Sequence, residues 1–303
     1  MIRYIAVILM IIFMDIYIPS AQEVIKISLP DIAAVKLKPY AKLNFAEIDE
    51  SSGIVKSRLW KNVYWTHNDS GDKARIFPIT RDGEIIKPDW AKDYQGILIP
   101  NAVNVDWESI TTDNQGNLII GDTGNNSNTR RDLTLYIVKE PYPWETVKTS
   151  VFQSIKFSYQ DLKEIPPAKM NYDTEAVFWR NGKLYILTKH RSDDYTTLYT
   201  IDSPDLLAEN TARLIQEFDS HGRVTDADAS ADGKRILMLT LNGIWMFQPK
   251  EDSENIFLGE IYWLPIEADQ CESICFDGNK IIVGNEQTEL FEVDPADLIK
   301  VTP

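Results

Sequence analysis

The chain has 303 residues, of which 44% are hydrophobic and 25% charged, and its formal net charge is −15. This composition is ordinary for a globular protein, and the acidic total argues against a nucleic-acid partner, which would need a basic patch. It is compatible with the binding of cations.

The first residues have the pattern of a secretory signal peptide. Arg3 precedes an apolar run at residues 5–14, and small or turn-forming residues at 19–21 offer a cleavage site. The run is too short for a membrane span, which needs about 20 apolar residues, although an uncleaved anchor is an alternative. We therefore expect a signal peptide at 1–21 and a single domain at 22–303. The protein would be exported, periplasmic or extracellular, with no stable membrane span after cleavage.

The rest of the chain repeats one pattern of strands and turns. Each copy has an acidic residue, a short strand, a turn, an apolar strand, a polar loop and an alternating strand. The turns of the later copies, Asn181-Gly182, Asp232-Gly233 and Asp277-Gly278, are typical of β-hairpins. The copies span residues 47–79, 104–140, 172–201, 225–248 and 270–293.

This repetition predicts an all-β, five-bladed β-propeller with four-stranded blades. A period of roughly 40 to 60 residues is the signature of a propeller or solenoid, and four strands per repeat favours a propeller. A strand at 41–45 would complete the last blade and close the ring, which removes an exposed edge. Six blades are an alternative if residues 82–100 or 150–167 hide a degenerate copy, and so is a β-sandwich or a two-domain β protein. A short helix is expected at 204–210.

Alignment of the copies on their first strand gives two columns rich in acids. The inner column is Ser52, Glu108, Glu175, Asp228 and Glu272, and the column two residues earlier is Glu50, Asp106, Asp173, Asp226 and Gln270. Residues i and i+2 share one face of a strand, so the eight carboxylates of these columns should ring one channel mouth. A hard cation such as Ca²⁺, which takes 6–8 oxygen ligands, would relieve their repulsion. The alternative is that these acids accept backbone N–H bonds and fix turns.

The loops after the apolar strands should face the same mouth, because the second strand of a blade ends where the first begins. His67 and His190 are candidate acid–base residues, since turns do not require histidine, and Asp69 is an alternative base. The candidate ligand-binding residues are Asn68, Asp122, Asn125, Arg131 and Lys189. The alternative is that all of these are solvated loop residues.

The two cysteines, Cys271 and Cys275, are not expected to form a disulfide. On one extended strand their Cα atoms would lie about 13 Å apart, at about 3.3 Å per residue, which is too far to bridge. We expect core or free thiols.

A set of short motifs carries a family resemblance. They are Glu50-x-Ser-Gly-Ile, Trp65-Thr-His-Asn-Asp-Ser-Gly71, Asn104-Val-Asp-Trp-Glu108, Gly121-Asp-x-Gly-Asn-Asn126, Arg131, Tyr136, Glu140-Pro141 and Asp173-x-Glu-Ala176. The combination resembles a family of exported bacterial β-propeller proteins and covers nearly all of the mature chain, with Asp226 and Asp228 departing from the more usual Glu. The Asp-x-Glu-Ala and Glu-Ser-Ile pieces also look like esterase-like phytase and phosphoesterase propellers, which implies hydrolysis at a metal-bearing channel mouth.

The sequence therefore predicts an exported propeller with a Ca²⁺-type site ringed by Glu108, Glu175, Asp228 and Glu272. A small anionic ligand, such as a phosphoester, would bind against the metal, His67, Lys189 and His190. In an enzyme, His67 or Asp69 would be the base for an attacking water. The alternative is a non-catalytic module that binds a carbohydrate, a protein or another cell-envelope component at the same mouth. A third hypothesis is a scaffold whose acids only cap the blades.

Overall fold

A computed structural model describes residues 23–302 of the chain, so the predicted signal peptide lies outside the described residues. Within this part, strands are the only regular secondary structure besides one 3-10 helix, η1 (Pro295–Asp297). The all-β prediction is confirmed. The described residues contain no helix with the length and apolar character needed to cross a membrane.

Most strands belong to four-stranded antiparallel units. The first unit contains β3 (Ser51–Lys56), β4 (Tyr64–Asn68), β5 (Arg75–Ile79) and β6 (Ile97–Leu98). The second contains β7 (Trp107–Thr112), β8 (Asn117–Asp122), β9 (Thr134–Lys139) and β10 (Val151–Tyr159). The third contains β11 (Asp173–Arg180), β12 (Lys183–Lys189), β13 (Tyr195–Ile201) and β14 (Asn210–Asp219).

The C-terminal half continues the same pattern. The next unit contains β15 (Val224–Ala229), β16 (Ile236–Thr240), β17 (Gly243–Pro249) and β18 (Gly259–Glu267). The last contains β19 (Cys271–Asp277), β20 (Lys280–Asn285) and β21 (Glu289–Val293), with β2 (Pro39–Lys42) from the N-terminal segment as its outer strand. The strand predicted at 41–45 is therefore found slightly earlier, paired with β21.

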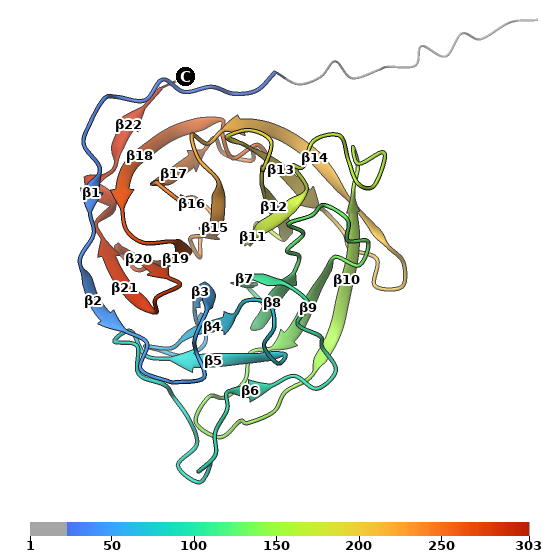
Figure 1. Cartoon of the computed structure of the whole chain (residues 1–303), viewed down its shortest axis with the longest axis vertical. Coiled ribbons are helices and arrows are strands. Elements are labelled where there is room, and N and C mark those ends of the chain that lie inside the picture. Colours follow the sequence, from blue (N-terminus) through green and yellow to red (C-terminus); the bar gives the residue numbers. More distant parts are fainter. Residues whose placement is uncertain (1–22, 303) are drawn as a thin grey trace, which may run out of the picture.

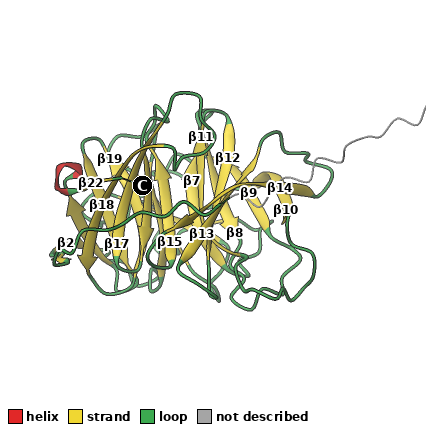
Figure 2. Ribbon diagram, turned by 90° about the horizontal axis from the view of Figure 1, so that it is seen from above, coloured by secondary structure: helices red, strands yellow, loops and turns green. Residues whose placement is uncertain are grey.

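The units are arranged around one central axis, with β3, β7, β11, β15 and β19 innermost (Figure 1). This is a propeller-like, repeat-built fold. In the side view the strands run between two faces that carry the loops (Figure 2). Outer strands add further pairings: β1 (Val35–Lys36) and β22 (Ile299–Val301) both join β18, and β10 pairs in parallel with β14, which links two units into one eight-stranded sheet.

The apolar core lies between neighbouring units. One cluster, for example, joins Val55 and Trp65 of the first unit to Ile110 and Leu118 of the second. Trp65, Trp107 and Trp245 are fully buried. Large rings suit this position because each contributes a large apolar area to the space between two sheets. Cys271 and Cys275 are buried free thiols, as predicted.

Each innermost strand has a β-bulge at the same place. The ladder to the second strand loses register at Gly53, Glu108, Glu175, Thr225 and Glu272. A bulge leaves one residue outside the ladder and redirects its side chain. These equivalent positions define how the copies align in space, and they determine which side chains reach the channel.

The helix predicted at 204–210 is wrong, because this stretch is an irregular loop held by the side chains of Asp205 and Asn210. Residues 82–100 and 150–167, where a hidden copy was the alternative, contribute the outer strands β6 and β10 to existing units.

Candidate metal centre at the channel mouth

Three glutamates from different units converge on one cavity. Glu108, Glu175 and Glu272 are the bulge residues of β7, β11 and β19, and all three line a cavity of about 450 Å³ at a mouth of the channel. In the other two units the bulge residue is Gly53 or Thr225. The ring of bulge carboxylates is therefore incomplete, because only three of the five units contribute one.

The alignment predicted for the fourth copy is wrong by three residues. The bulge of β15 falls at Thr225, so Arg223 is the equivalent of Asp106, and Arg223 lines the cavity. Asp226 and Asp228 lie farther along β15 and do not reach this mouth. The sequence prediction missed Arg223 because the short strand can be read with either register when the bulge is not known.

Asp226 and Asp228 instead join two neighbouring units. Both are buried, and they accept the backbone N–H groups of Ile274 (2.7 Å) and Phe276 (2.9 Å) on β19. Asp228 also lines a separate cavity at the other end of the channel. This is the turn-and-backbone role that the sequence left as an alternative for the acidic columns, and it holds for these two residues.

We expect Asp226→Ala to lower the free energy of unfolding by about 2–4 kcal/mol, because it leaves buried backbone donors of two strands without their charged acceptor. Asp226→Asn keeps one of the two acceptor oxygens but turns an N–H₂ group toward the other backbone N–H, so it should cost less than the alanine variant without being neutral. Urea unfolding followed by tryptophan fluorescence measures both. Equal losses in the two variants would contradict this role of the side chain.

The alignment of the first copy is wrong by one residue. The bulge falls at Gly53, so Ser51, rather than Glu50, is the equivalent of Asp106. Gly53 has a φ of 82°, and a Cβ there would lie 2.9 Å from Nε2 of His67, so glycine is required. Glu50 still lines the cavity from the preceding loop.

Asp69, Asp106 and Glu108 form the closest group of carboxylates at the mouth. One oxygen atom of each lies within 4.8 Å of an oxygen of the other two. Asp69 comes from the loop after β4, whereas Asp106 and Glu108 come from the start of β7. Gly124 closes over the pair on β7, since a β-carbon there would collide with both carboxylates.

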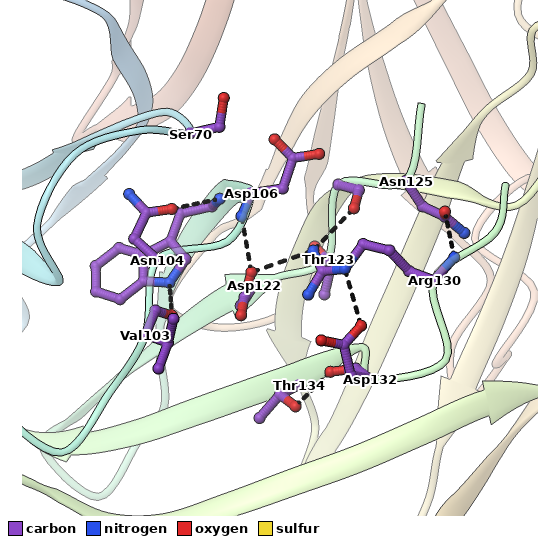
Figure 3. A network of polar contacts seen from close by, with 12 residues as sticks. Ser70, Val103, Asn104, Asp106, Asp122, Thr123, Asn125, Arg130, Asp132 and Thr134 are labelled. Atoms are coloured by element: carbon purple, nitrogen blue, oxygen red, sulfur yellow. Dashed lines mark hydrogen bonds and ion pairs between the residues drawn. The ribbon is translucent and has the colours of Figure 1, made fainter. Parts of the chain in front are cut away.

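A network of buried polar groups fixes the backbone beneath this trio (Figure 3). Asp122 accepts the backbone N–H of Asp106 at 2.9 Å, and Arg130 donates to Asp122 at 3.2 Å and to the carbonyl oxygen of Gly124 at 2.9 Å. Asp122, predicted to bind a ligand, thus holds Asp106 in position.

The trio carries negative charge that the described protein does not neutralise by direct contact. Burial, and then the charge of Asp69, raises the pKa of Asp106 to about 6. Burial, followed by Glu175 and Asp69, raises the pKa of Glu108 well above its usual value. Among the described residues, no ion pair reaches any of the three; the nearby cations pair with other acids. A bound divalent cation would remove this cost.

Lysine and arginine neutralise the acids of the neighbouring third unit. Lys189 Nζ lies 3.0 Å from Glu175, and Arg191 lies 2.6 Å from Asp173 and 3.8 Å from Glu175. Burial alone would lower the pKa of Lys189, but the surrounding glutamates outweigh it and raise that pKa. Asp173 also accepts the backbone N–H of Asn125 at 2.6 Å. It is therefore fully engaged. Arg191 is a cavity residue that the predicted set omitted.

Glu272 and Arg223 complete the mouth. Burial raises the pKa of Glu272 to about 7, Lys189 opposes the shift and Glu286 adds to it. Arg223 is exposed, lines the cavity and makes no ion pair among the described residues. The mouth thus places an unpaired guanidinium in the same cavity as an uncompensated group of acids.

His67 lies inside the protein rather than in the cavity. It is fully buried, its ring packs edge-on against Trp107 at 5.8 Å, and its Nδ1 lies 3.0 Å from the carbonyl oxygen of Asn68. Burial lowers its pKa to about 4. Of the predicted acid–base residues, only Asp69 lines the cavity.

His190 anchors the loop between β12 and β13. Its Nδ1 lies 2.6 Å from Asp193 and its Nε2 3.0 Å from the hydroxyl of Thr197, and it is almost fully buried. Burial lowers its pKa. Because His190 stands between Lys189 and Arg191, this anchoring positions the two cations of the mouth.

Three other residues predicted to bind a ligand, Asn68, Asn125 and Arg131, do not line this cavity. Asn68 donates to the carbonyl oxygen of Glu47 at 2.8 Å and to Asp72 at 2.9 Å. The side-chain oxygen of Asn125 accepts two backbone N–H groups of its own loop. Arg131 lines a different cavity, near β10. The neighbouring Asn126, not Asn125, lines the mouth.

No protein-family model matches the chain, and no curated protein matches it in sequence. The predicted membership of an exported propeller family therefore stays a prediction. Among solved structures, the chain is similar to the WD40 β-propeller domain of Doa1, with 10% identity, a TM-score of 0.42, and 84% of this chain and 95% of that one covered. It is also similar to Kuenenia stuttgartiensis hydrazine synthase, with 8% identity, a TM-score of 0.42, and 81% and 72% covered. The computationally designed Ika8 protein matches with 10% identity, a TM-score of 0.31, and 80% and 70% covered.

Proposed function

We propose that the chain is a five-bladed propeller whose channel mouth binds a divalent cation, Ca²⁺ by preference, through Asp69, Asp106 and Glu108. The blade count is supported by the bulge that recurs once in each four-stranded unit. The cation site is supported by one observation above all: three carboxylates from two units crowd within 4.8 Å without a protein cation in contact.

The chemistry of the donors favours Ca²⁺. All three offer oxygen only, and neither cysteine nor solvent-facing histidine stands beside them, which argues against Zn²⁺. Three protein carboxylates leave room in a shell of six to eight oxygens for water and for a ligand. Ca²⁺ bound here would polarise an oxygen of that ligand.

A small anionic ligand is the partner that fits the rest of the cavity. Arg223 is unpaired, and Lys189 and Arg191 line the same wall. A phosphoester or carboxylate could contact Arg223 with one oxygen and face the cation site with another. If the protein hydrolyses such an ester, half-buried Asp69 is the residue placed to accept a proton from the attacking water. Export of the protein, which would expose it to extracellular calcium, remains part of this proposal.

A non-catalytic binding module is the second candidate. It is favoured by the burial of His67 and His190, which leaves the cavity without a histidine to act as acid or base. In this version the same cation and the same guanidinium bind an anionic component of the cell envelope, and no bond is broken.

Calorimetric titration of the chelator-treated protein with CaCl₂ tests the cation site. We expect saturable binding of calcium, and a higher Tm in excess calcium than in chelator. No heat of binding and an unchanged Tm would refute the site. Assay of the calcium-loaded protein on aryl phosphomonoesters, phosphodiesters and lactones then separates the candidates. Calcium-dependent turnover supports a hydrolase, and binding without turnover supports the module.

A further inference from the structure

An exposed aromatic surface lies on the first two units, on the loops that leave the face opposite the channel mouth. Trp90 is 60% exposed, Tyr142 47% and Trp144 39%. The last two pack edge-on against Trp60, with ring centroids 5.2 and 6.3 Å away. Surface of this kind marks a binding site, because apolar area left in water costs free energy.

Trp90 forms one wall of a cavity of about 450 Å³. Its indole N–H donates to Glu145 at 3.3 Å, which holds the exposed ring in one orientation. Tyr94 borders the same cavity but is only 5% exposed, because its ring packs into the core between the first two units and against Phe45. The polar residues of the rim are Lys92, Asp93, Gln95 and Lys148.

We propose that this cavity binds a neutral saccharide. The flat apolar face of a pyranose ring would stack on the exposed face of Trp90, and its hydroxyl groups would contact the polar rim. Lys92 and Lys148 are balanced by Asp93 and Glu145, so the site offers no net charge to attract an anion or a cation. A protein partner would favour an apolar centre free of charges, whereas here charged and amide groups border the ring directly. The volume is in the range of small-ligand sites.

Calorimetry with cellohexaose, maltohexaose, laminarihexaose and chitohexaose tests this site in the full chain. At least one of these should bind saturably in the millimolar range or tighter, and Trp90→Ala should weaken that binding by about tenfold or more. Phe152→Ala removes another exposed aromatic ring, one that does not line the cavity, and should leave the affinity unchanged. Circular dichroism confirms that both variants are folded.

Three outcomes would overturn the proposal: no binding of any of the four sugars, binding that Trp90→Ala leaves intact, or a Trp90-dependent dimer in sedimentation velocity without sugar binding. The last would assign the surface to a second copy of the chain. The experiment is run with and without chelator. Sugar binding that persists in chelator is independent of the proposed cation site, so either proposal can fail alone.

Discussion

Replacing Glu108 with glutamine should raise the Tm of the metal-free protein while removing its response to calcium. Glu108 is buried between Asp69, Asp106 and Glu175, and its charge is unfavourable there without a cation. The amide has nearly the same shape, carries no charge, and its N–H₂ group can donate to the neighbouring carboxylates. We expect a gain of about 1–2 kcal/mol in chelator, or about 3 °C in Tm.

Glu108→Gln should thus have two effects together: a higher Tm without calcium and no further stabilisation by calcium. Substitution of an ordinary structural residue lowers the stability of the protein and leaves its stabilisation by calcium unchanged. Differential scanning fluorimetry in chelator and in excess CaCl₂ measures both effects. Glu50→Gln is the matched control, because Glu50 lines the same cavity outside the trio and should keep the calcium response. A Glu108→Gln variant that is less stable in chelator and still stabilised by calcium would contradict the cation site.

In chelator, the protein should become more stable as the pH is lowered from 8 to 5.5. Burial raises the pKa of Glu272 to about 7 and that of Asp228 to about 6. An acid whose pKa is higher in the folded than in the unfolded state binds protons more tightly when folded. The destabilising effect of its negative charge therefore grows as the pH rises from the pKa of the unfolded state, near 4, to the pKa of the folded state. Summed over both groups, the gain is about 2–3 kcal/mol. Buried His67, whose pKa burial lowers to about 4, subtracts about 1.4 kcal/mol of this between pH 6.5 and 5.5, and His190 acts in the same direction. The net gain is therefore about 1 kcal/mol, or about 2 °C in Tm.

Carboxylates with lowered pKa values, such as Asp277 at about 2, lose their stabilising effect only at lower pH and do not offset this trend. Their contribution is complete above the unfolded pKa. Glu272→Gln should flatten most of the slope of Tm against pH, whereas Glu286→Gln, on the mouth but less buried, should leave most of it. A Tm that falls steadily from pH 8 to 5.5 in the wild type would show that these groups are not as desolvated as the structure indicates.

The repeat and the strand content were readable from the sequence because hairpin signals and alternating apolar residues act locally. Asn181 and Gly182, for instance, have φ values of 50° and 83°, the left-handed pair that a tight hairpin turn requires. The N-terminal strand in the last unit could also be predicted, since a ring of repeats otherwise leaves an open edge. The loop at 204–210 was misread because side-chain bonds of Asp205 and Asn210 override a weak helical pattern.

The site was predicted less well, and the bulge is the reason. The extra residue of a bulge changes the face on which every preceding side chain lies. The sequence of a short apolar strand does not reveal where the bulge falls. Glu108, Glu175 and Glu272 were identified because their copies shared one register. Asp226 looked equivalent to Asp106 only because both are acidic. Arg223, the true equivalent, could have been found by aligning Val224 with the buried residue that precedes each bulge.

The placement of β2 as the outer strand beside β21 has a consequence for biogenesis. Synthesis proceeds from the N-terminus, so β2 emerges early, and the strand it pairs with is among the last to be made. The ring can be sealed only after translation has nearly finished, and until then both strands expose unpaired backbone groups. Deleting either strand should therefore produce the same defect: soluble repeats that open at one seam and associate through it.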